Sequence, residues 1–376
     1  MANLKVDTVS GIGTEGPVLN GGLHFRSKNY LTLPKGTTTE RTATSSGIST
    51  VIGAIRYNTD SNKMECYIND KWMIVSTSSP NLDGGARGVF FGGAPSNNAA
   101  IDFITISTAG DAGDFGDMTS HRVQGAAGSS NTRGVYGNGE APSITDRIEF
   151  ITFSSTGDAT DFGDTTDGRR RANGMGLSNQ TRALFNGGYS PGTVNTIDFI
   201  TIAETGNAVD YGDLTVPRES GACCASPTRG IISGGRNQPA NTALSSIDFV
   251  TIPSLGNAQD FGDLTVARFS GQSCSNSTRG LIFAGSTPSN SNVIDFITIA
   301  STGNAANFGD TISAMQYPLG AVASPTRAVL GGGLDPSALN TIQYVEISTQ
   351  GDAVDFGDLQ HAKSEASGCS NAHGGL

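Results

Sequence analysis

A six-residue apolar pattern, typified by the letters IDFITI, recurs six times along the chain. Successive copies begin 47, 49, 50, 47 and 48 residues apart. The hexads begin at Ile101, Ile148, Ile197, Ile247, Ile294 and Ile342. A strand that carries apolar side chains on both faces is expected where neighbouring sheets stack on one another. The hexads therefore predict six equivalent buried strands.

An aromatic motif follows every hexad at a constant offset of 13 residues from its first isoleucine. It reads DFGD from Asp114, Asp161, Asp260 and Asp355, DYGD from Asp210 and NFGD from Asn307. Two more features recur between this motif and the next hexad: an arginine ten residues before a threonine, and an apolar run from that threonine that ends in two glycines. Together they predict four strands in each repeat. A period near 48 residues with several short strands is typical of a β-propeller.

The two ends of the repeat region complement each other. The first repeat begins in mid-unit at Arg87 and lacks a leading strand, whereas the run from Ser364 to Ser370 corresponds to that leading strand. We therefore expect the C-terminal strand to complete the first blade, which removes open sheet edges. The prediction is an all-β fold, a six-bladed β-propeller over residues 83–376.

The region before the propeller divides into three parts. Residues 1–50 are rich in Gly, Thr and Ser with scattered apolar residues, which predicts an extended attachment arm that orders on a partner. Within residues 51–76, three strand-like runs alternate with turn residues and predict a small three-stranded β-meander. Residues 77–82 are the expected linker.

Composition and charge narrow the class of protein. The chain has 51 glycines, 15% charged residues and a net charge of −11, which suits many tight turns and argues against nucleic-acid binding. No signal peptide and no apolar run of membrane-spanning length is visible, so we expect no membrane insertion. The five cysteines lack paired spacing and are expected as small buried residues of a protein made in a reducing cytoplasm.

The repeated DFG tripeptide also occurs as the magnesium-binding motif of protein kinases, but no kinase phosphate loop or catalytic loop accompanies it. Because it occurs at one position of every repeat, we interpret it as a structural turn. The spacing of Asp111, Asp114 and Asp117 could also present carboxylates to calcium, and this alternative stays open. The histidines lack metal spacing and no nucleophile motif is present, so we expect no enzyme, metal or cofactor.

Arginines that open the second strand of each repeat could line a binding channel. The favoured interpretation is that each one hydrogen-bonds a turn carboxylate of its own or the adjacent blade. The residues predicted to serve this structural role are Asp114, Arg133, Asp161, Arg182, Asp210, Arg229, Asp260, Arg279, Asp355 and Arg327.

The loops after the glycine pairs differ freely from repeat to repeat, and the fourth, from Arg236 to Ser246, is the longest. Variable loops on a rigid framework are where recognition usually occurs, although any single loop can be merely tolerant surface. The candidate binding residues are Asn97, Asn98, Ser143, Tyr189, Arg236, Asn237, Gln238, Asn241, Asn290 and Asp335.

The repeats resemble degenerate kelch repeats. The run from Arg268 through Gly280 to the hexad at Ile294 carries the resemblance, and glycine pairs end the second strand at Gly92-Gly93, Gly187-Gly188, Gly234-Gly235 and Gly331-Gly332. The second and fifth repeats depart from the pair, and Phe or Tyr replaces the kelch tryptophan. The resemblance implies a kelch-like propeller and leaves its function open.

The N-terminal part resembles virion proteins of tailed bacteriophages. The stretch from Gly53 to Val75 is similar to a module of virion and tail-fibre proteins, and Leu4 to Phe25 is similar to leaders of structural proteins in phages of marine cyanobacteria. The resemblance implies a virion structural protein, either a tail-fibre or tail-associated receptor-binding component for host attachment or a capsid or vertex decoration protein. A propeller enzyme acting on surface polysaccharide is the third alternative.

The resemblance also implies partners. Other virion proteins would bind residues 1–76, and a host-surface glycan or protein would bind the propeller loops. We expect a homo-oligomer within the particle, assembled in the host cytoplasm.

Overall fold

The computed structural model describes residues 33–41, 54–61, 63–68, 71–74, 86–95, 99–140 and 142–376. The chain divides into two compact units, Met1–Ser79 and Pro80–Leu376. The described residues are all-β apart from one short 3-10 turn, η1 (Thr39–Arg41). No described helix is long and apolar enough to cross a membrane. The predicted linker, residues 77–82, lies outside the described residues.

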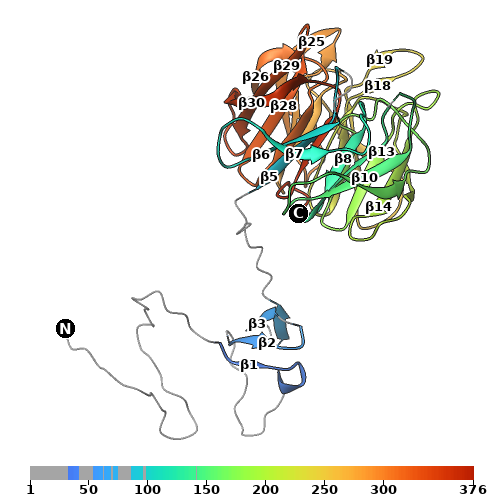
Figure 1. Cartoon of the computed structure of the whole chain (residues 1–376). Coiled ribbons are helices and arrows are strands. Elements are labelled where there is room, and N and C mark those ends of the chain that lie inside the picture. Colours follow the sequence, from blue (N-terminus) through green and yellow to red (C-terminus); the bar gives the residue numbers. More distant parts are fainter. Residues whose placement is uncertain are drawn as a thin grey trace, which may run out of the picture. The chain divides into compact units, whose positions relative to one another are not determined.

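Unit 2 is built from antiparallel sheets that each contain four main strands (Figure 1). The first sheet orders β31 (Ser367–Ser370), β5 (Arg87–Phe91), β6 (Ala100–Thr105) and β7 (Gly113–Asp117). The second orders β8 (Ala126–Ser129), β9 (Arg133–Gly137), β10 (Arg147–Thr152) and β11 (Thr160–Asp164). The third orders β12 (Gly176–Ser178), β13 (Arg182–Asn186), β14 (Thr196–Thr201) and β15 (Val209–Asp213).

The fourth sheet orders β16 (Ala222–Ala225), β17 (Arg229–Ser233), β20 (Ser246–Thr251) and β21 (Gln259–Asp263). The fifth orders β22 (Gln272–Ser275), β23 (Arg279–Phe283), β25 (Ser289–Thr298) and β26 (Ala306–Met315). The sixth orders β27 (Gly320–Ala323), β28 (Arg327–Leu334), β29 (Ala338–Glu346) and β30 (Val354–Lys363). Short strands β18 (Arg236–Asn237) and β19 (Thr242–Ala243) form a hairpin, and β24 (Ser286–Thr287) pairs with β25.

The chain ends beside the strand that opens the repeats. In the first sheet β31 pairs with β5, with Ser367 opposite Phe91 and Ser370 opposite Gly88. The first strands of the sheets contact one another in the order β31, β8, β12, β16, β22 and β27, and β27 contacts β31. Repeated four-stranded antiparallel sheets in this arrangement are consistent with a β-propeller.

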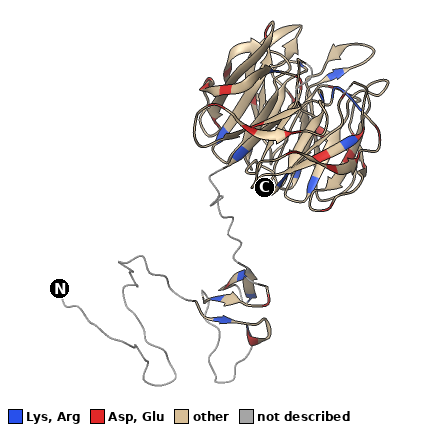
Figure 2. Cartoon of the chain, viewed as in Figure 1, with Lys and Arg blue, Asp and Glu red and all other residues tan. Residues whose placement is uncertain are grey.

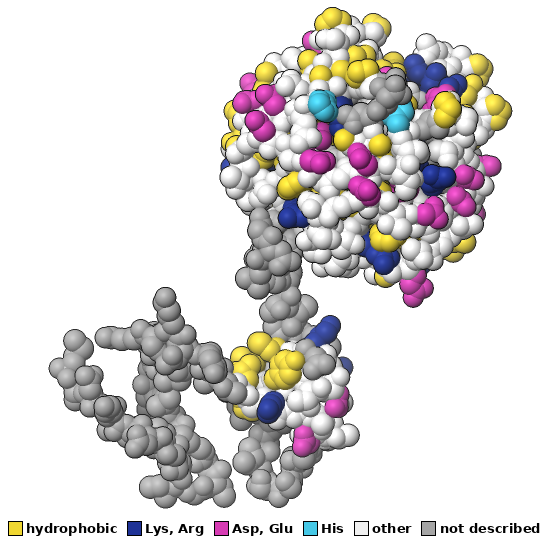
Figure 3. All heavy atoms as spheres, in the orientation of Figure 1, with side chains coloured by type: hydrophobic (Ala, Val, Ile, Leu, Met, Phe, Trp, Pro, Cys, Tyr) yellow, Lys and Arg dark blue, Asp and Glu magenta, His cyan; other side chains and the backbone are white. Residues whose placement is uncertain are grey.

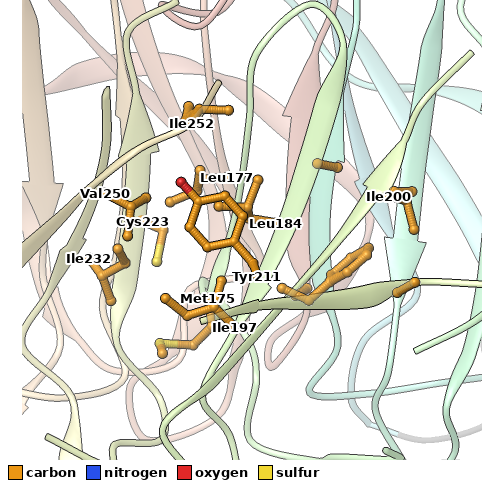
Figure 4. Close-up of a cluster of buried hydrophobic side chains, with 14 of the residues drawn as sticks. Met175, Leu177, Leu184, Ile197, Ile200, Tyr211, Cys223, Ile232, Val250 and Ile252 are labelled. Carbon is orange, nitrogen blue, oxygen red and sulfur yellow. The ribbon is translucent and has the colours of Figure 1, made fainter. Parts of the chain in front are cut away.

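Every hexad forms the third strand of its sheet, and its first isoleucine is fully buried because neighbouring sheets cover both faces. Figure 4 shows one such core, where Tyr211 and Leu184 of the third sheet pack against Cys223 and Ile232 of the fourth. Burying an aliphatic or aromatic side chain of this size stabilises the fold by about 1.5–3 kcal/mol. The apolar pattern of the hexads therefore supplies most of the contact between sheets.

The aromatic motif forms the fourth strand predicted at this place, and a β-bulge stands where a turn was expected within it. In the first sheet the register shift follows the pairing of Ile101 with Gly116 and precedes that of Asp102 with Asp114. The extra residue, Phe115, turns inward and packs edge-on against Phe103 at 6.0 Å between ring centroids. A bulge of this kind lets one strand bury an aromatic ring between two exposed aspartates.

Unit 1 contains a four-stranded sheet in place of the predicted three-stranded meander. Strands β2 (Ile55–Asn58), β3 (Lys63–Ile68) and β4 (Lys71–Ile74) form where expected, and β1 (Lys35–Gly36) adds a parallel strand beside β2. The stretch Thr37–Arg41, expected as part of the extended arm, is anchored because Arg41 forms an ion pair with the buried Glu65. The remainder of that arm, residues 1–32 and 42–50, lies outside the described residues.

The other face of this small sheet is apolar and exposed. Ile55, Cys66 and Met73 stand opposite one another across three strands. Ile55, Ile68 and Met73 are 47%, 45% and 52% exposed. Hydrophobic side chains gather on the described part of unit 1 in Figure 3. An apolar sheet face next to a buried polar face is typical of a module that binds a partner.

Candidate binding site at the mouth of the central cavity

Five of the six sheets contain a buried ion pair that joins the hexad to the segment before the first strand. The second hexad residue is an acid in five sheets, and it is fully buried. The pairs are Lys363–Asp102 at 3.1 Å, Arg122–Glu149 at 3.0 Å, Arg169–Asp198, Arg218–Asp248 at 3.0 Å and Arg268–Asp295 at 3.1 Å. Burial lowers the pKa of Arg169 to about 10, so the guanidinium stays charged at neutral pH.

The sixth sheet replaces both charges together. Met315 occupies the position of the cation. Its backbone carbonyl accepts the N–H of Gly285 in the preceding sheet, just as the carbonyl of Arg218 accepts the N–H of Gly188. Gln343 stands where the acid would be, and both residues are almost fully buried. A lone buried charge is costly, which explains why the two charges disappear in the same repeat. In the third repeat the arginine ten residues before the threonine is Arg171, but the ion pair uses Arg169.

A threonine from the preceding sheet completes the acid's bonding. Thr215, for example, donates both its backbone N–H and its hydroxyl to the Asp248 carboxylate, at 3.0 Å and 2.8 Å. Thr119 and Thr265 serve Glu149 and Asp295 in the same way, and Thr166 donates its hydroxyl to Asp198. Among the described residues Asp102 has Lys363 as its ion-pair partner and receives no threonine, and burial raises the pKa of Asp102. We call these contacts between successive sheets the seams.

The repeated arginines also belong to the seams, but their partners differ from the prediction. Arg182 donates to the carbonyl of Ile252 in the next sheet at 2.9 Å and stacks on Phe199 of its own sheet at 4.7 Å. The other predicted arginines, Arg133, Arg229, Arg279 and Arg327, likewise bind backbone carbonyls of the next sheet. Arg87 was not in the predicted set, but it makes the same contact by donating to the carbonyl of Phe153 in the next sheet. Of these second-strand arginines, Arg327 alone also binds a carboxylate of a described residue, that of Glu346.

The predicted aspartates Asp114, Asp161, Asp210, Asp260 and Asp355 are exposed on the fourth strands. The edge beside them is covered by the next sheet. Gly157 and Ala159 donate backbone N–H groups to the carbonyls of Phe115 and Asp117 at 2.7 Å and 2.8 Å, and Asp158 accepts the N–H of Asp117. This cover blocks pairing with other chains. Among the described residues, no group of three or more His, Cys, Asp or Glu side chains is placed to hold a metal ion.

The first strands enclose a cavity of about 50 Å³, which we call the central cavity. Strands of all six sheets line it, with Ser129, Ser178, Ser275 and Ser370 among the lining residues. His373 closes one end, where its Nε2 lies 3.0 Å from the carbonyl of Ser129, and burial lowers the pKa of His373 to about 4. Cys223, Cys224, Cys274 and Cys369 are buried in its lining as predicted, and burial raises the pKa of each thiol.

At the other end, one residue of each sheet adopts a left-handed conformation just before the first strand. These residues are Gln124, Arg171, Ser220, Ser270, Tyr317 and Glu365, with φ between 51° and 62°. Their backbones form a continuous chain of hydrogen bonds from sheet to sheet. Each bond runs from a backbone N–H to the carbonyl of the left-handed residue in the preceding sheet. The bonds are Ser220 to Arg171, Ser270 to Ser220, Tyr317 to Ser270, Glu365 to Tyr317, Gln124 to Glu365 and Ala172 to Gln124. We call this end the mouth.

Each sheet also presents one bridged pair of residues at the mouth. The pairs are Ala94 with Ser364, Val123 with Glu140, Arg170 with Tyr189, Glu219 with Arg236, Phe269 with Ser286 and Gln316 with Leu334. The backbone geometry is the same in all six pairs, yet no two carry the same side chains. A constant backbone that displays different side chains is what recognition of an irregular ligand requires.

The third and fourth sheets bring an arginine–aromatic cluster together at the mouth. Arg170 and Arg171 lie over the ring of Tyr189, 5.1 Å and 5.2 Å from its centroid. Arg171 and Arg236 both bind the buried Glu219, at 3.0 Å and 2.8 Å. The cluster thus unites two predicted binding residues, Tyr189 and Arg236. The sequence did not reveal Arg170, Arg171 and Glu219, because nothing local shows that they reach the same place. Strand β18 carries Arg236 (Figure 2).

Several of the remaining predicted binding residues form hydrogen bonds within their own loop or to the neighbouring loop. The hydroxyl of Thr193 lies 3.3 Å from Asn237 Oδ1, and Gln238 Nε2 donates to Asn241. Asn290 donates to Asp335 and to the carbonyl of Leu334. Ser143 is exposed, and Asn97 and Asn98 lie outside the described residues. These bonds link the loop of the third sheet to that of the fourth, and the loop of the fifth sheet to that of the sixth.

A scan against protein-family models gives no match, and a search of curated proteins gives no significant match.

Proposed function

We propose that this chain is a virion structural protein of a tailed phage whose second unit is a six-bladed, kelch-like propeller with a ligand-binding mouth. The pairing of β31 with β5 supports a ring closed by the C-terminal strand. The observation that carries the binding function is the mouth itself, where six sheets repeat one backbone and present six different pairs of side chains. The ligand is a host-surface glycan or protein, and the chain is a tail-fibre or tail-associated component.

Unit 1 serves as the attachment module in this proposal. Its resemblance to phage virion proteins and the exposed row of Ile55 and Met73 support docking on another virion protein. Assembly would bury these exposed hydrophobic side chains. This explains why the sheet carries polar residues on the face buried within unit 1 and apolar residues on its exposed face.

Immunogold labelling of intact particles tests the location. The proposal expects gold at the tail and a loss of host adsorption when antibody covers the propeller. Gold confined to capsid vertices would instead identify a decoration protein. Incubation with host surface polysaccharide tests for an enzyme, because shortened polymer would contradict a purely binding role.

A further inference from the structure

The arginine–aromatic cluster carries more positive charge than its own carboxylates neutralise. Among the described residues, Arg170, Arg171 and Arg236 form ion pairs with Glu140 and Glu219, and two of the three guanidiniums share Glu219. The rest of the unit is acidic, since residues 80–376 contain 15 Lys and Arg against 28 Asp and Glu. A local positive site in an acidic surface selects and orients an anionic ligand that would otherwise be repelled.

The exposed guanidiniums keep donors available. The side chains of Arg170 and Arg171 are 31% and 32% exposed. Each binds its glutamate through Nη1, and no bond from Nη2 to a described residue is present in either. The hydroxyl of Tyr189 likewise has no partner within the described part of the chain. A planar carboxylate can accept donors from two guanidiniums at once, which is the geometry that arginine favours.

The mouth favours a ligand recognised through side chains and not through a peptide backbone. The bridged pairs and the chain of bonds through Ser220 and Ser270 occupy backbone groups that an added strand would need. Amide side chains also stand at the mouth, that of Gln124 beside Ala172 and that of Gln316 in the sixth sheet. Such groups match the hydroxyls of a sugar.

We propose that the mouth binds an acidic saccharide, whose carboxylate lies between Arg170 and Arg171 beside the hydroxyl of Tyr189. The inference rests on the proposed glycan-binding function and adds the class of glycan and the residues that select it. Glu219 is a positioning residue, because its buried carboxylate holds Arg171 and Arg236 in place without reaching the ligand.

Calorimetric titration of the full chain with an oligogalacturonate and with its methyl ester tests the proposal. The two probes share one sugar backbone, and the ester replaces each carboxylate by an uncharged methyl ester. The acid should bind at least about tenfold more tightly than the ester, and added NaCl should weaken it. The double variant R170Q/R171Q should lose about tenfold or more in affinity for the acid. Equal binding of both probes, or no binding of the acid at millimolar concentration, would overturn the proposal.

A charge-matched control removes two cations elsewhere. K71Q/R147Q changes two exposed residues that do not belong to the arginine–aromatic cluster and should bind the acid within about twofold of the unmodified chain. Unfolding midpoints in urea verify that all variants are folded, and Y189F provides a milder test that removes only the hydroxyl. Adsorption to host cells separates the two levels of the account. Adsorption that survives R170Q/R171Q would overturn the acidic-saccharide site and leave the glycan-binding function standing. Binding of the acid probe without any host adsorption would overturn the host-binding function and leave the acidic-saccharide site standing.

Discussion

The seams and the mouth are made from the same repeated backbone, but they use it in opposite ways. In the seams a cation, a buried acid and a threonine from the preceding sheet return with little change, as in Arg218, Asp248 and Thr215. At the mouth the equivalent positions carry Glu219 and Arg236 in one sheet and Phe269 and Ser286 in the next. The comparison teaches that buried charge must be matched in every sheet, whereas the mouth is free to differ because its backbone bonds already hold it.

The largest effect is expected from breaking one seam. Arg218→Met leaves Asp248 buried without its cation and should lower the free energy of unfolding by about 3–5 kcal/mol in urea denaturation. The double variant R218M/D248Q copies the Met315 and Gln343 arrangement of the sixth sheet and should recover most of that loss. A double variant less stable than R218M would contradict the account of why both charges disappear together.

A backbone contact between sheets should matter next. Gly262 has φ of 148°, and a Cβ there would lie 2.4 Å from the carbonyl oxygen of Gly303 in the next sheet. Gly262→Ala should cost about 2 kcal/mol or more in the same assay. Gly256→Ala is the matched control, because it has the same φ of 148° and nothing within 4 Å of its Cβ. Equal losses in the two variants would show that backbone strain alone, and not contact between sheets, sets the cost.

The pH dependence of the first sheet should differ from that of the others. Burial raises the pKa of Asp102, so the folded chain favours the protonated carboxyl. The free energy of unfolding gains from this protonation in full below the unfolded-state pKa of Asp102, and the gain is lost as the pH rises through the folded-state pKa. Asp102→Asn, which leaves the buried Lys363 without its acid, should therefore cost less stability at pH 7 than Asp248→Asn, and its difference from the unmodified chain should close in acid. Asp248→Asn, which removes an acceptor of Thr215 and Arg218, should be destabilised at pH 7. Urea unfolding across a pH series measures both, and identical profiles would refute the distinction.

The smallest effect is expected at the mouth. Arg171→Ser introduces a serine at a left-handed position where the fourth and fifth sheets already have one, Ser220 and Ser270. Glu219 keeps Arg236 as its partner, so the free energy of unfolding should fall by about 1 kcal/mol or less. A loss as large as that of Arg218→Met would remove the contrast between mouth and seam.

Residue patterns predicted the strands well because burial repeats with the period of the chain. The hexads and the three strands from Ile55 to Ile74 formed where alternation placed them. The pairing of β31 with β5 followed from the incomplete first repeat. A turn was wrongly expected within the aromatic motif, because Gly116 suggested one and the bulge that buries Phe115 leaves no separate sequence signal.

The candidate site was only partly visible in the sequence. Tyr189 and Arg236 were found because their loops vary, but Arg170 and Arg171 belong to a segment whose role depends on contacts with two other sheets. The partners of the repeated arginines were wrong for a related reason. A carbonyl acceptor such as that of Ile252 has no side-chain signature, so sequence reasoning assigned the arginines to the nearest carboxylates.

Native-state hydrogen exchange of the C-terminal strand tests the central claim most directly, because the claim requires β31 to be as firmly held as any other first strand. The amides of Ser367–Ser370 should exchange with the same free energy of opening as those of β22, Gln272–Ser275, namely that of global unfolding. Exchange of β31 at a distinctly lower free energy than β22 would mean that the first sheet opens on its own, and would contradict a propeller closed by its last strand.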